Sequence, residues 1–445
     1  MSNKKFDRES LESEDTAPSQ GSSLSQESFN DFDTDYHSRI CTGCNCLCDD
    51  VSYYLKKGQM VRTLNLCEIA MKKLRSVTAD NRLIPLPPDI LSESIDKAAK
   101  LLKNNGTPLI LGADALDEKG IQTSNDFARQ LKGLWLPWGF TGVKRFYECV
   151  KLYGWASSLL DEVRDRAETV IFWRADPLDT HHRHLSRYSF FPRGRYTELG
   201  NTDRNLAVIA DYEAVIEPLC QQFFNIEPDE DIRLIKALMN PAMEPPYEHR
   251  DFPILVNSLQ RSSYIAIFVD PENTDNETLK TLFEWSESIN TSNMKRMVIL
   301  PLINAGSNIE GFTRISLEHH ATGYGFDFSD NKPDNKQGVS EDVDWEMIAD
   351  KAGSVVMFES GPEGAHRKRL PESLSEKPLI IITPFKQEPL ENADITIPVA
   401  LSGIETDGVF FRADGMPLLS KKIDGMEVNE YPLAHRVLKE ILKIY

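Results

Sequence analysis

The stretch Tyr264-Ile-Ala-Ile-Phe-Val269 is an uninterrupted apolar run, and runs of this kind decide the fold class. A strand with apolar side chains on both faces is typical of a parallel sheet that lies between two layers of helices. Similar runs recur at 108–112, 169–173, 206–210, 297–301, 354–358 and 379–382. Their recurrence predicts an α/β fold with two doubly wound, parallel-sheet lobes.

Stretches with helical spacing alternate with these runs. Four apolar residues lie on one face of the segment 92–102, which predicts an amphipathic helix. Further helices are expected over 117–132, 276–288 and 433–442. The lobes are assigned to residues 85–445, because the stiff stretch Pro85-Leu-Pro-Pro88 suits a domain boundary.

Charge and hydropathy exclude several classes of protein. The chain has 445 residues and a formal net charge of −19, so it repels nucleic acid and anionic membrane surfaces. Its apolar runs last only a few residues, whereas a membrane helix needs about 20. No apolar stretch follows the first lysines, so we expect no secretory signal and a cytoplasmic location.

The N-terminal segment differs from the rest of the chain. Residues 1–40 hold nine acidic residues, four basic residues and nine serines, with few aliphatic side chains. Such a composition cannot bury enough apolar surface to fold. Residues 1–38 are therefore expected to form a disordered, acidic, serine-rich tail.

Five of the seven cysteines lie between positions 41 and 67. An odd, clustered number in a chain without a secretory signal argues against disulfides and favours a metal site. Three thiols in one tight loop and one distant thiol can complete a four-thiolate shell for zinc or an iron–sulfur cluster. We expect a [4Fe–4S] cluster in a small domain over 39–84, with zinc or an unmetallated site as alternatives and Cys46 as a spare thiol. The four ligands would be Cys41, Cys44, Cys48 and Cys67.

A family resemblance rests on four stretches of sequence. They are Cys41-Thr-Gly-Cys44 with Cys48-Asp-Asp-Val51; Val170-Ile-Phe-Trp-Arg-Ala-Asp-Pro177; Asn308-Ile-Glu-Gly311; and the segment 397–415 with its Gly403-Ile-Glu405. Together they resemble the B subunit of formylmethanofuran dehydrogenases, which are molybdenum or tungsten enzymes related to formate dehydrogenases. The resemblance runs from about residue 38 to the end of the chain.

The resemblance implies a fold and a set of cofactors. It implies a small cluster domain on α/β lobes, without the C-terminal β-barrel of larger relatives, and a cluster on the four cysteines named above. In active members it also implies a metal centre held by two pterin guanine dinucleotides, which reduces carbon dioxide to formate.

The loop expected to hold that metal departs from the family pattern. The segment 112–120 contains neither a cysteine nor a histidine. Asp114, Asp117 and Glu118 are hard ligands and poor replacements for a thiolate on molybdenum. The segment 301–308 also lacks the arginine that the family places beside the metal.

The loops expected to hold the pterin cofactors depart as well. Arg174 stands where the family usually has a glycine, and Asp176 adds negative charge where a pyrophosphate would lie. The turn at 211–215 lacks the basic and hydroxyl residues of a nucleotide site. We therefore expect no molybdopterin guanine dinucleotide and no redox chemistry at carbon.

These losses resemble a bacterial branch of the family that works as a formyltransferase/hydrolase complex. That branch passes a formyl group from tetrahydromethanopterin to methanofuran and releases formate. The resemblance implies a non-catalytic scaffold whose partners are amidohydrolase-type, formyltransferase and C-type subunits. The alternatives are an active oxidoreductase component with an unusual metal ligand and a free-standing iron–sulfur protein.

Two further groups of residues are candidate sites. His181, His182 and His184 could hold zinc, but no cysteine or carboxylate lies close by in sequence, and packing against a partner protein of the complex is the favoured interpretation. A basic stretch suits salt bridges within the chain or between subunits, or contact with an anionic cofactor tail. It consists of Arg183, Arg187, Arg193, Arg195 and Arg204.

Overall fold

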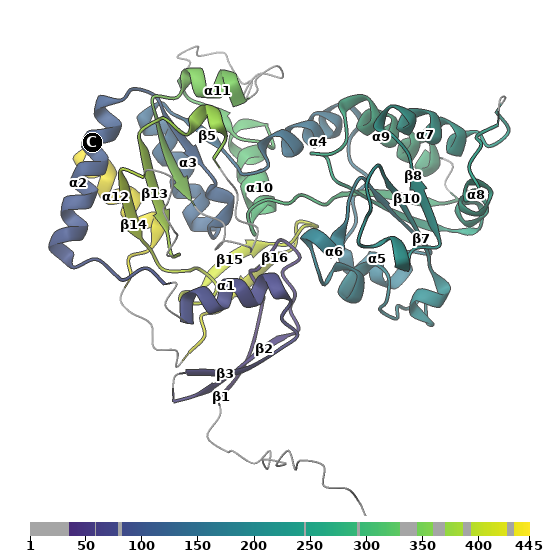
Figure 1. Cartoon of the computed structure of the whole chain (residues 1–445), viewed down its shortest axis with the longest axis horizontal. Helices are drawn as coiled ribbons and strands as arrows, with labels where there is room; N and C mark the ends of the chain where they lie inside the picture. Colours follow the sequence, from purple (N-terminus) through teal and green to yellow (C-terminus); the bar gives the residue numbers. More distant parts are fainter. Residues whose placement is uncertain are drawn as a thin grey trace, which may run out of the picture.

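Two α/β lobes lie side by side, with a smaller cysteine-bearing unit below them (Figure 1). The computed structural model describes residues 35–57, 59–78, 82–243, 246–291, 294–329, 345–358, 370–385, 393–424 and 431–445. The expected tail lies outside the described residues up to position 34. Among the described helices, none combines the length and apolar character needed to cross a bilayer.

The first lobe contains a six-stranded sheet in the order β11-β5-β4-β12-β13-β14, parallel except for β11. Its strands are β4 (Pro108–Leu111), β5 (Leu134–Leu136), β11 (Phe326–Asp327), β12 (Ser354–Phe358), β13 (Leu379–Thr383) and β14 (Ile395–Pro398). Its helices are α2 (Pro88–Asn104), α3 (Glu118–Leu131), α4 (Phe140–Tyr153), α10 (Ile309–His320), α11 (Trp345–Lys351) and α12 (Ala434–Ile444), with the short turns η1 (Ala113–Ala115) and η6 (Glu372–Leu374).

The second lobe contains a fully parallel sheet in the order β10-β9-β6-β7-β8. Its strands are β6 (Thr169–Trp173), β7 (Asn205–Ala210), β8 (Gln222–Asn225), β9 (Tyr264–Val269) and β10 (Arg296–Pro301). Its α-helices are α5 (Leu160–Arg166), α6 (Pro177–Thr180), α7 (Asp231–Met239), α8 (Phe252–Arg261) and α9 (Asn276–Thr291). Its shorter helical turns are η2 (Leu185–Ser189), η3 (Gly200–Asp203), η4 (Glu217–Leu219) and η5 (Pro228–Glu230).

The second lobe is an insertion in the first. The chain builds β4 and β5, leaves to form the five strands from β6 to β10, and returns to complete the first sheet with β11 to β14. Helix α4 lies between the two lobes (Figure 1). The predicted α/β class and the two parallel-sheet lobes are confirmed.

The strands are buried on both faces, as their unbroken apolar runs predict. In β4, Leu109 and Leu111 belong to one core cluster, whereas Ile110 belongs to another. In β9, Ile265 and Tyr264 likewise point into different clusters. Since side chains alternate along a strand, each sheet is covered on both sides.

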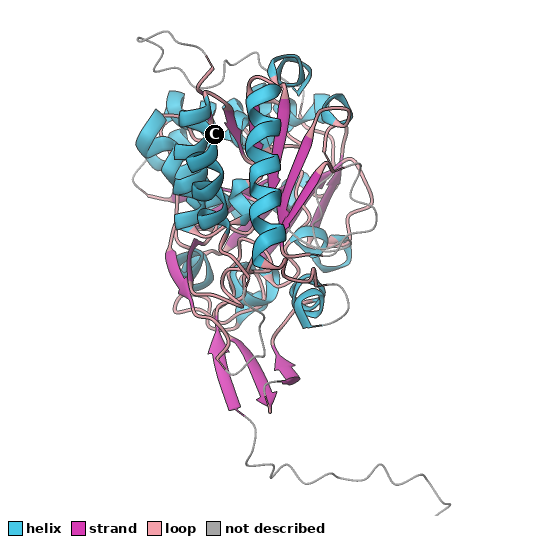
Figure 2. Ribbon diagram, turned by 90° about the vertical axis from the view of Figure 1, so that its left-hand side faces the viewer, coloured by secondary structure: helices cyan, strands magenta, loops and turns pink. Residues whose placement is uncertain are grey.

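The cysteine-bearing unit is a three-stranded antiparallel sheet followed by one helix. It consists of β1 (Asp35–Arg39), β2 (Val51–Lys56), β3 (Gln59–Leu64) and α1 (Glu68–Thr78). Figure 2 shows its three strands projecting below the lobes. This unit begins earlier than expected: composition assigns residues 35–38 to the tail, yet they pair with β2 from Asp35↔Leu55 to Ser38↔Ser52. Their polar sequence gives no strand signal, because it is the backbone pairing with β2 that extends them.

A hairpin near the C-terminus connects the parts. It is formed by β15 (Gly408–Phe411) and β16 (Pro417–Ser420), which pair antiparallel. The Ser420 hydroxyl donates a hydrogen bond to the Ile40 carbonyl at 3.2 Å, beside the cysteine-bearing unit. All four sheets in the described part of the chain are open, with free edge strands.

Candidate functional site: the cysteine loop and the loops after β4 and β6

The five N-terminal cysteines are gathered in one apolar cluster. Cys41, Cys46 and Cys48 are buried, and Cys44 and Cys67 lie half-buried against them. Burial, with smaller contributions from the nearby Cys44 and Cys67 thiols, raises the pKa of Cys41 to about 12. Burial likewise raises the pKa of Cys48, with added contributions from Cys41 and Cys44. Neighbouring thiols therefore disfavour the ionisation of Cys41 and Cys48, whereas a hydrogen bond with Cys46 lowers the pKa of Cys44.

The cluster also contains a buried cation. The Lys73 ammonium donates a hydrogen bond to the Thr42 carbonyl at 2.7 Å. Burial lowers the pKa of Lys73 to about 8, against the opposing effect of the Cys41 and Cys44 sulfurs. A positive charge here would balance part of the negative charge of a thiolate-ligated centre.

The donor chemistry of the loop suits a thiolate-bound iron–sulfur centre, and the Gly43 N–H already points at the Cys41 sulfur at 3.4 Å. Yet within the described residues, no group of three or more His, Cys, Asp or Glu side chains is arranged to hold a metal ion. The assignment of a cluster to Cys41, Cys44, Cys48 and Cys67 therefore stays a prediction.

The cysteine loop is clamped to the second lobe by the segment that follows β6. The Arg183 guanidinium donates to both oxygens of Asp50, at 2.6 and 2.7 Å. Arg187 pairs with the neighbouring Asp49. The Tyr188 hydroxyl donates to the Cys46 carbonyl at 3.0 Å. These contacts come from residues 183–188, and together they fix the loop that carries the thiols.

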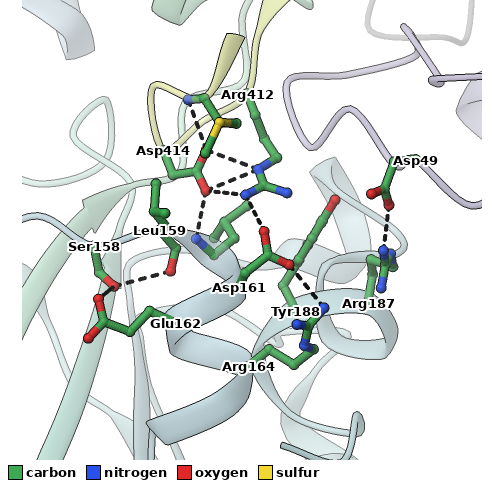
Figure 3. A network of polar contacts seen from close by, with 12 residues as sticks. Asp49, Ser158, Leu159, Asp161, Glu162, Arg164, Arg187, Tyr188, Arg412 and Asp414 are labelled. Carbon is green, nitrogen blue, oxygen red and sulfur yellow. Dashed lines mark hydrogen bonds and ion pairs between the residues drawn. The ribbon is translucent and has the colours of Figure 1, made fainter. Parts of the chain in front are cut away.

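A second set of contacts joins the C-terminal hairpin to the same segment (Figure 3). The Arg412 guanidinium, 3% exposed, forms hydrogen bonds of 2.7–3.0 Å to Asp414 and of 2.6 Å to Asp161. It also lies over the Tyr188 ring, 5.3 Å from the centroid. The buried Asp414 carboxylate accepts from the Leu160 N–H, at the start of α5, at 2.6 Å. These contacts hold together the hairpin, α5 and the clamp segment, residues 183–188.

The three histidines do not form a zinc site in the described structure, and His181 and His184 pack within this chain. The His181 ring shares a hydrogen bond of 2.6 Å with Asn45 of the cysteine loop. His184 is buried between Phe172 and Phe268, and burial lowers its pKa to about 3. The favoured expectation, packing against a partner protein, is wrong for these two rings, because the chain's own core surrounds them. His182 is half-buried.

Three of the five arginines of the basic stretch form ion pairs or hydrogen bonds with other residues of this chain. Arg183 and Arg187 pair with Asp50 and Asp49, as described above. Arg204 is buried, and its guanidinium donates to the main-chain carbonyls of Ala167 and Phe190 at 3.1 and 2.8 Å. The predicted salt bridges within the chain are therefore present for two of the five arginines. Arg193 and Arg195 are exposed.

The carboxyl ends of β6 and β7 are filled by the Arg174 side chain. Arg174 is 1% exposed and lies at φ 53°, in the left-handed region that favours glycine. Its guanidinium binds both oxygens of Asp231, at 2.7 and 3.0 Å, and one oxygen of Asp211 at 3.1 Å. The Asp176 carboxylate caps α6 by accepting from the Leu178 N–H at 2.9 Å. Ligands of doubly wound sheets bind at such strand ends, and here the chain's own side chains occupy the position.

The loop after β4 is closed in a similar way. Asp114 is fully buried, and its carboxylate accepts from the Trp138 and Gly306 N–H groups at 2.9 and 2.7 Å. Asp117 caps α3 by accepting from the Gly120 N–H at 2.9 Å, and Glu118 is the first residue of that helix. The carboxylates considered as hard metal ligands are thus engaged with the backbone or lie apart from one another.

Sequence reasoning missed the clamp and the pinned hairpin. Asp49 and Asp50 entered only as part of a family motif, and Arg412 and Asp414 only as members of the segment 397–415. The available signal was a dense set of arginines in an acidic chain, which demands many carboxylate partners. It could not say which carboxylates those would be.

Comparison with known proteins gives the context of these features. No family model matches the chain. The chain is 25% identical over 415 residues to the B subunit of the tungsten-containing formylmethanofuran dehydrogenase 2 of Methanococcus maripaludis, an alignment that covers 86% of this chain and 93% of the relative. It is 24% identical over 432 residues to the protein of the same name from Methanocaldococcus jannaschii, covering 91% and 96%.

A solved structure shares the fold. A chain in the crystal structure of the formyltransferase/hydrolase complex of Methylorubrum extorquens, determined with methylofuran, superposes with a TM-score of 0.62 at 18% identity. The match covers 79% of this chain and 95% of that one. The similarity of this chain to the B subunit of formylmethanofuran dehydrogenases, which four stretches of its sequence predict, is thereby confirmed over most of its length.

Proposed function

We propose that this protein is the B-type component of a cytoplasmic formyltransferase/hydrolase complex in one-carbon metabolism. Within that complex it serves as a scaffold, while formyl transfer from tetrahydromethanopterin to methanofuran and hydrolysis to formate take place on other subunits. The similarity to the B subunit of formylmethanofuran dehydrogenases and the shared fold with a chain of a formyltransferase/hydrolase complex support this assignment.

The observation that carries the scaffold role is the buried Arg174. A nucleotide phosphate at the carboxyl ends of β6 and β7 would need a close backbone approach and positive or neutral surroundings. The site instead holds an arginine that two carboxylates, Asp211 and Asp231, already neutralise. Displacing it would leave the Asp231 carboxylate, 2% exposed, without its charged partner, which is costly.

The loop after β4 supports the same proposal. Asp114 lies in the loop where the resemblance places the metal ligand of active relatives, and its carboxylate accepts hydrogen bonds from two backbone N–H groups. Position 112 also has no room for a side chain: a Cβ there would lie 2.2 Å from the Trp138 ring nitrogen and 2.5 Å from the Phe358 carbonyl. A thiolate ligand could not be supplied from position 112 itself.

The proposed partners are amidohydrolase-type, formyltransferase and C-type subunits. The proposed cofactor is a [4Fe–4S] cluster on Cys41, Cys44, Cys48 and Cys67, which would hold the cysteine loop folded. In an oxidoreductase such a cluster relays electrons; here we propose a structural role. The molybdopterin guanine dinucleotide is proposed to be absent.

The competing function is that of an active oxidoreductase component, and the names of the two curated relatives, both tungsten-containing, favour it. Elemental and pterin analysis of the purified complex distinguishes the two. Iron without stoichiometric tungsten or molybdenum, together with formyl-transfer and hydrolase activity, supports the scaffold. One metal and two pterin guanine dinucleotides per chain would overturn it.

A further inference from the structure

The second lobe has an accessible surface at the amino ends of β9 and β10 that none of the contacts above use. Two hollows meet there, of about 460 and 190 Å³. Both are lined by Lys295, just before β10. Arg296 faces the larger hollow and Met297 the smaller, so the hollows open on opposite faces of the sheet.

The larger hollow is basic and partly aromatic. It is lined by Arg166, Lys295 and Arg296 and by one carboxylate, Glu168. That carboxylate already accepts hydrogen bonds from the Ser263 hydroxyl and the Tyr264 N–H, at 2.7 and 3.1 Å. Arg166 forms an ion pair with Glu162, with a nitrogen–oxygen distance of 3.3 Å, but its side chain remains half exposed. Arg296 is exposed. In a chain of net charge −19, such a surface is suited to an anionic group.

The smaller hollow is apolar. It lies between α7, α8 and α9 and is lined by side chains that include Leu238, Met239, Val256 and Trp285. Met239 is 41% exposed. Met294, which lines the larger hollow, is 82% exposed. A ligand that covers this whole surface must therefore carry acidic groups and at least one large apolar side chain.

We propose that residues 6–15 of this chain dock on this surface. The segment Phe6-Asp-Arg-Glu-Ser-Leu-Glu-Ser-Glu-Asp15 has five acidic residues, one basic residue and two large apolar side chains. Nineteen residues lie between Asp15 and Asp35, where the described chain begins, and this length of chain can span up to about 65 Å. The segment would cross the sheet edge at Lys295, with Phe6 or Leu11 in the apolar hollow and its acids over Arg166 and Arg296.

Carbodiimide cross-linking of the full-length protein tests the proposal, because it joins lysine amines to adjacent carboxylates. Mass spectrometry is expected to find Lys295 linked to a carboxylate within residues 7–15. Hydrogen–deuterium exchange is expected to show protection at the amino ends of β9 and β10. Charge reversal of the tail, Glu12→Lys with Glu14→Lys and Asp15→Lys, should lower the exchange protection about tenfold.

Matched variants guard against unrelated effects. Arg166→Glu with Arg296→Glu should abolish the same signals, whereas Arg436→Glu, on the exposed face of α12 in the first lobe, should leave them unchanged. The tail variants alter no described residue, so a loss of signal in them does not report misfolding.

Three outcomes would overturn the proposal. The first is that hydrogen–deuterium exchange at the amino ends of β9 and β10 is the same in the tail variants as in wild type. The second is linkage of Lys295 only between isotopically distinct copies, which would assign the surface to a second chain. The third is linkage only to an acidic segment of another protein in the assembled complex.

Discussion

Asp50 and Arg183, 133 residues apart in sequence, form a two-pronged ion pair with nitrogen–oxygen distances of 2.6 and 2.7 Å. Asp50 directly follows the Cys48 and Asp49 of the cysteine loop, whereas Arg183 follows the first strand of the inserted lobe. The position of the thiols therefore depends on the second lobe as well as on the small unit that carries them.

Replacement of Asp50 by asparagine should loosen this loop. Both side chains are partly exposed, so the cost in unfolding free energy should be roughly 1 kcal/mol. Although burial raises the pKa of Asp50, hydrogen bonds from Arg183 outweigh it and lower the pKa below 3.8. The stabilisation is thus present above the unfolded value and lost as pH falls through the lower folded value. Urea unfolding of wild type and Asp50→Asn from pH 7 to 3 measures this; a gap that does not narrow at all between pH 5 and pH 3 would contradict it.

Replacement of Arg412 should lower the free energy of unfolding far more than replacement of Asp50. The Arg412→Ala variant leaves the Asp414 carboxylate, 0% exposed, without its charged partner. Breaking a buried pair in this way costs about 3–5 kcal/mol. Arg412→Lys should recover part of the loss, because an ammonium keeps the charge but not the forked geometry. Arg436→Ala is the exposed control, expected within about 0.5 kcal/mol of wild type. A loss at Arg412 no larger than at Arg436 would show that the hairpin is not pinned.

The Arg174–Asp231 pair can be examined by a double-mutant cycle. Arg174→Met should lower the free energy of unfolding by about 3–5 kcal/mol, since it leaves the buried Asp231 without its charged partner. Burial raises the pKa of Asp231 even beside the arginine, so protonation will recover part of the loss at low pH. Arg174→Met with Asp231→Leu should be closer to wild type than either single variant. Additive losses measured by chemical denaturation would argue that the two side chains act independently.

His184 should contribute to acid sensitivity at mildly acidic pH. Burial lowers its pKa from 6.5 to about 3, so the folded state holds the neutral ring. A depressed folded value means that stability is fully present above 6.5 and falls as pH drops from 6.5 towards 3. His184→Gln, which is neutral throughout, should weaken this dependence between pH 7 and 4, as followed by the midpoint of thermal unfolding. An unchanged slope would exclude the buried neutral ring.

Replacing both Cys44 and Cys48 by serine should damage assembly rather than chemistry. The unit that carries them is small, and metal ligation would supply much of its folding free energy. The stoichiometry of this chain in the purified complex is expected to fall, with formyl transfer and hydrolysis falling in proportion. Intact stoichiometry with lost turnover would instead indicate an electron relay, and no change in either would indicate unused thiols.

Much of the fold follows from single stretches of sequence. The runs at 169–173 and 264–269 could be recognised as strands because both of their faces are apolar. Strand β5, Leu134–Leu136, is only three residues long, and the sequence of β8 is Gln-Phe-Phe-Asn, so neither had a clear signal. The insertion of one lobe into the other could not be predicted either. It depends on the pairing of β4 with β12, and the whole inserted lobe separates these two strands in sequence.

The candidate site could be predicted only in its local parts. The spacing of the cysteines indicated a shared site, and their common burial is consistent with it. The clamp could not be found, because Asp50 and Arg183 meet only through the packing of two separate units. The role of Arg174 was interpreted as a loss of glycine, whereas the structure shows a gain: a buried cation with two carboxylate partners.

The nested arrangement of the lobes has a consequence for biosynthesis. Strand β4 pairs with β12, yet roughly 220 residues separate the end of β5 from the start of β12, which at 5–20 residues per second is a delay of roughly 10–40 s on the ribosome. During that interval the inserted lobe, whose five strands are contiguous in the chain, can complete its own sheet. The half-made first sheet meanwhile exposes an apolar edge, so the nascent chain needs protection there until its last third has emerged.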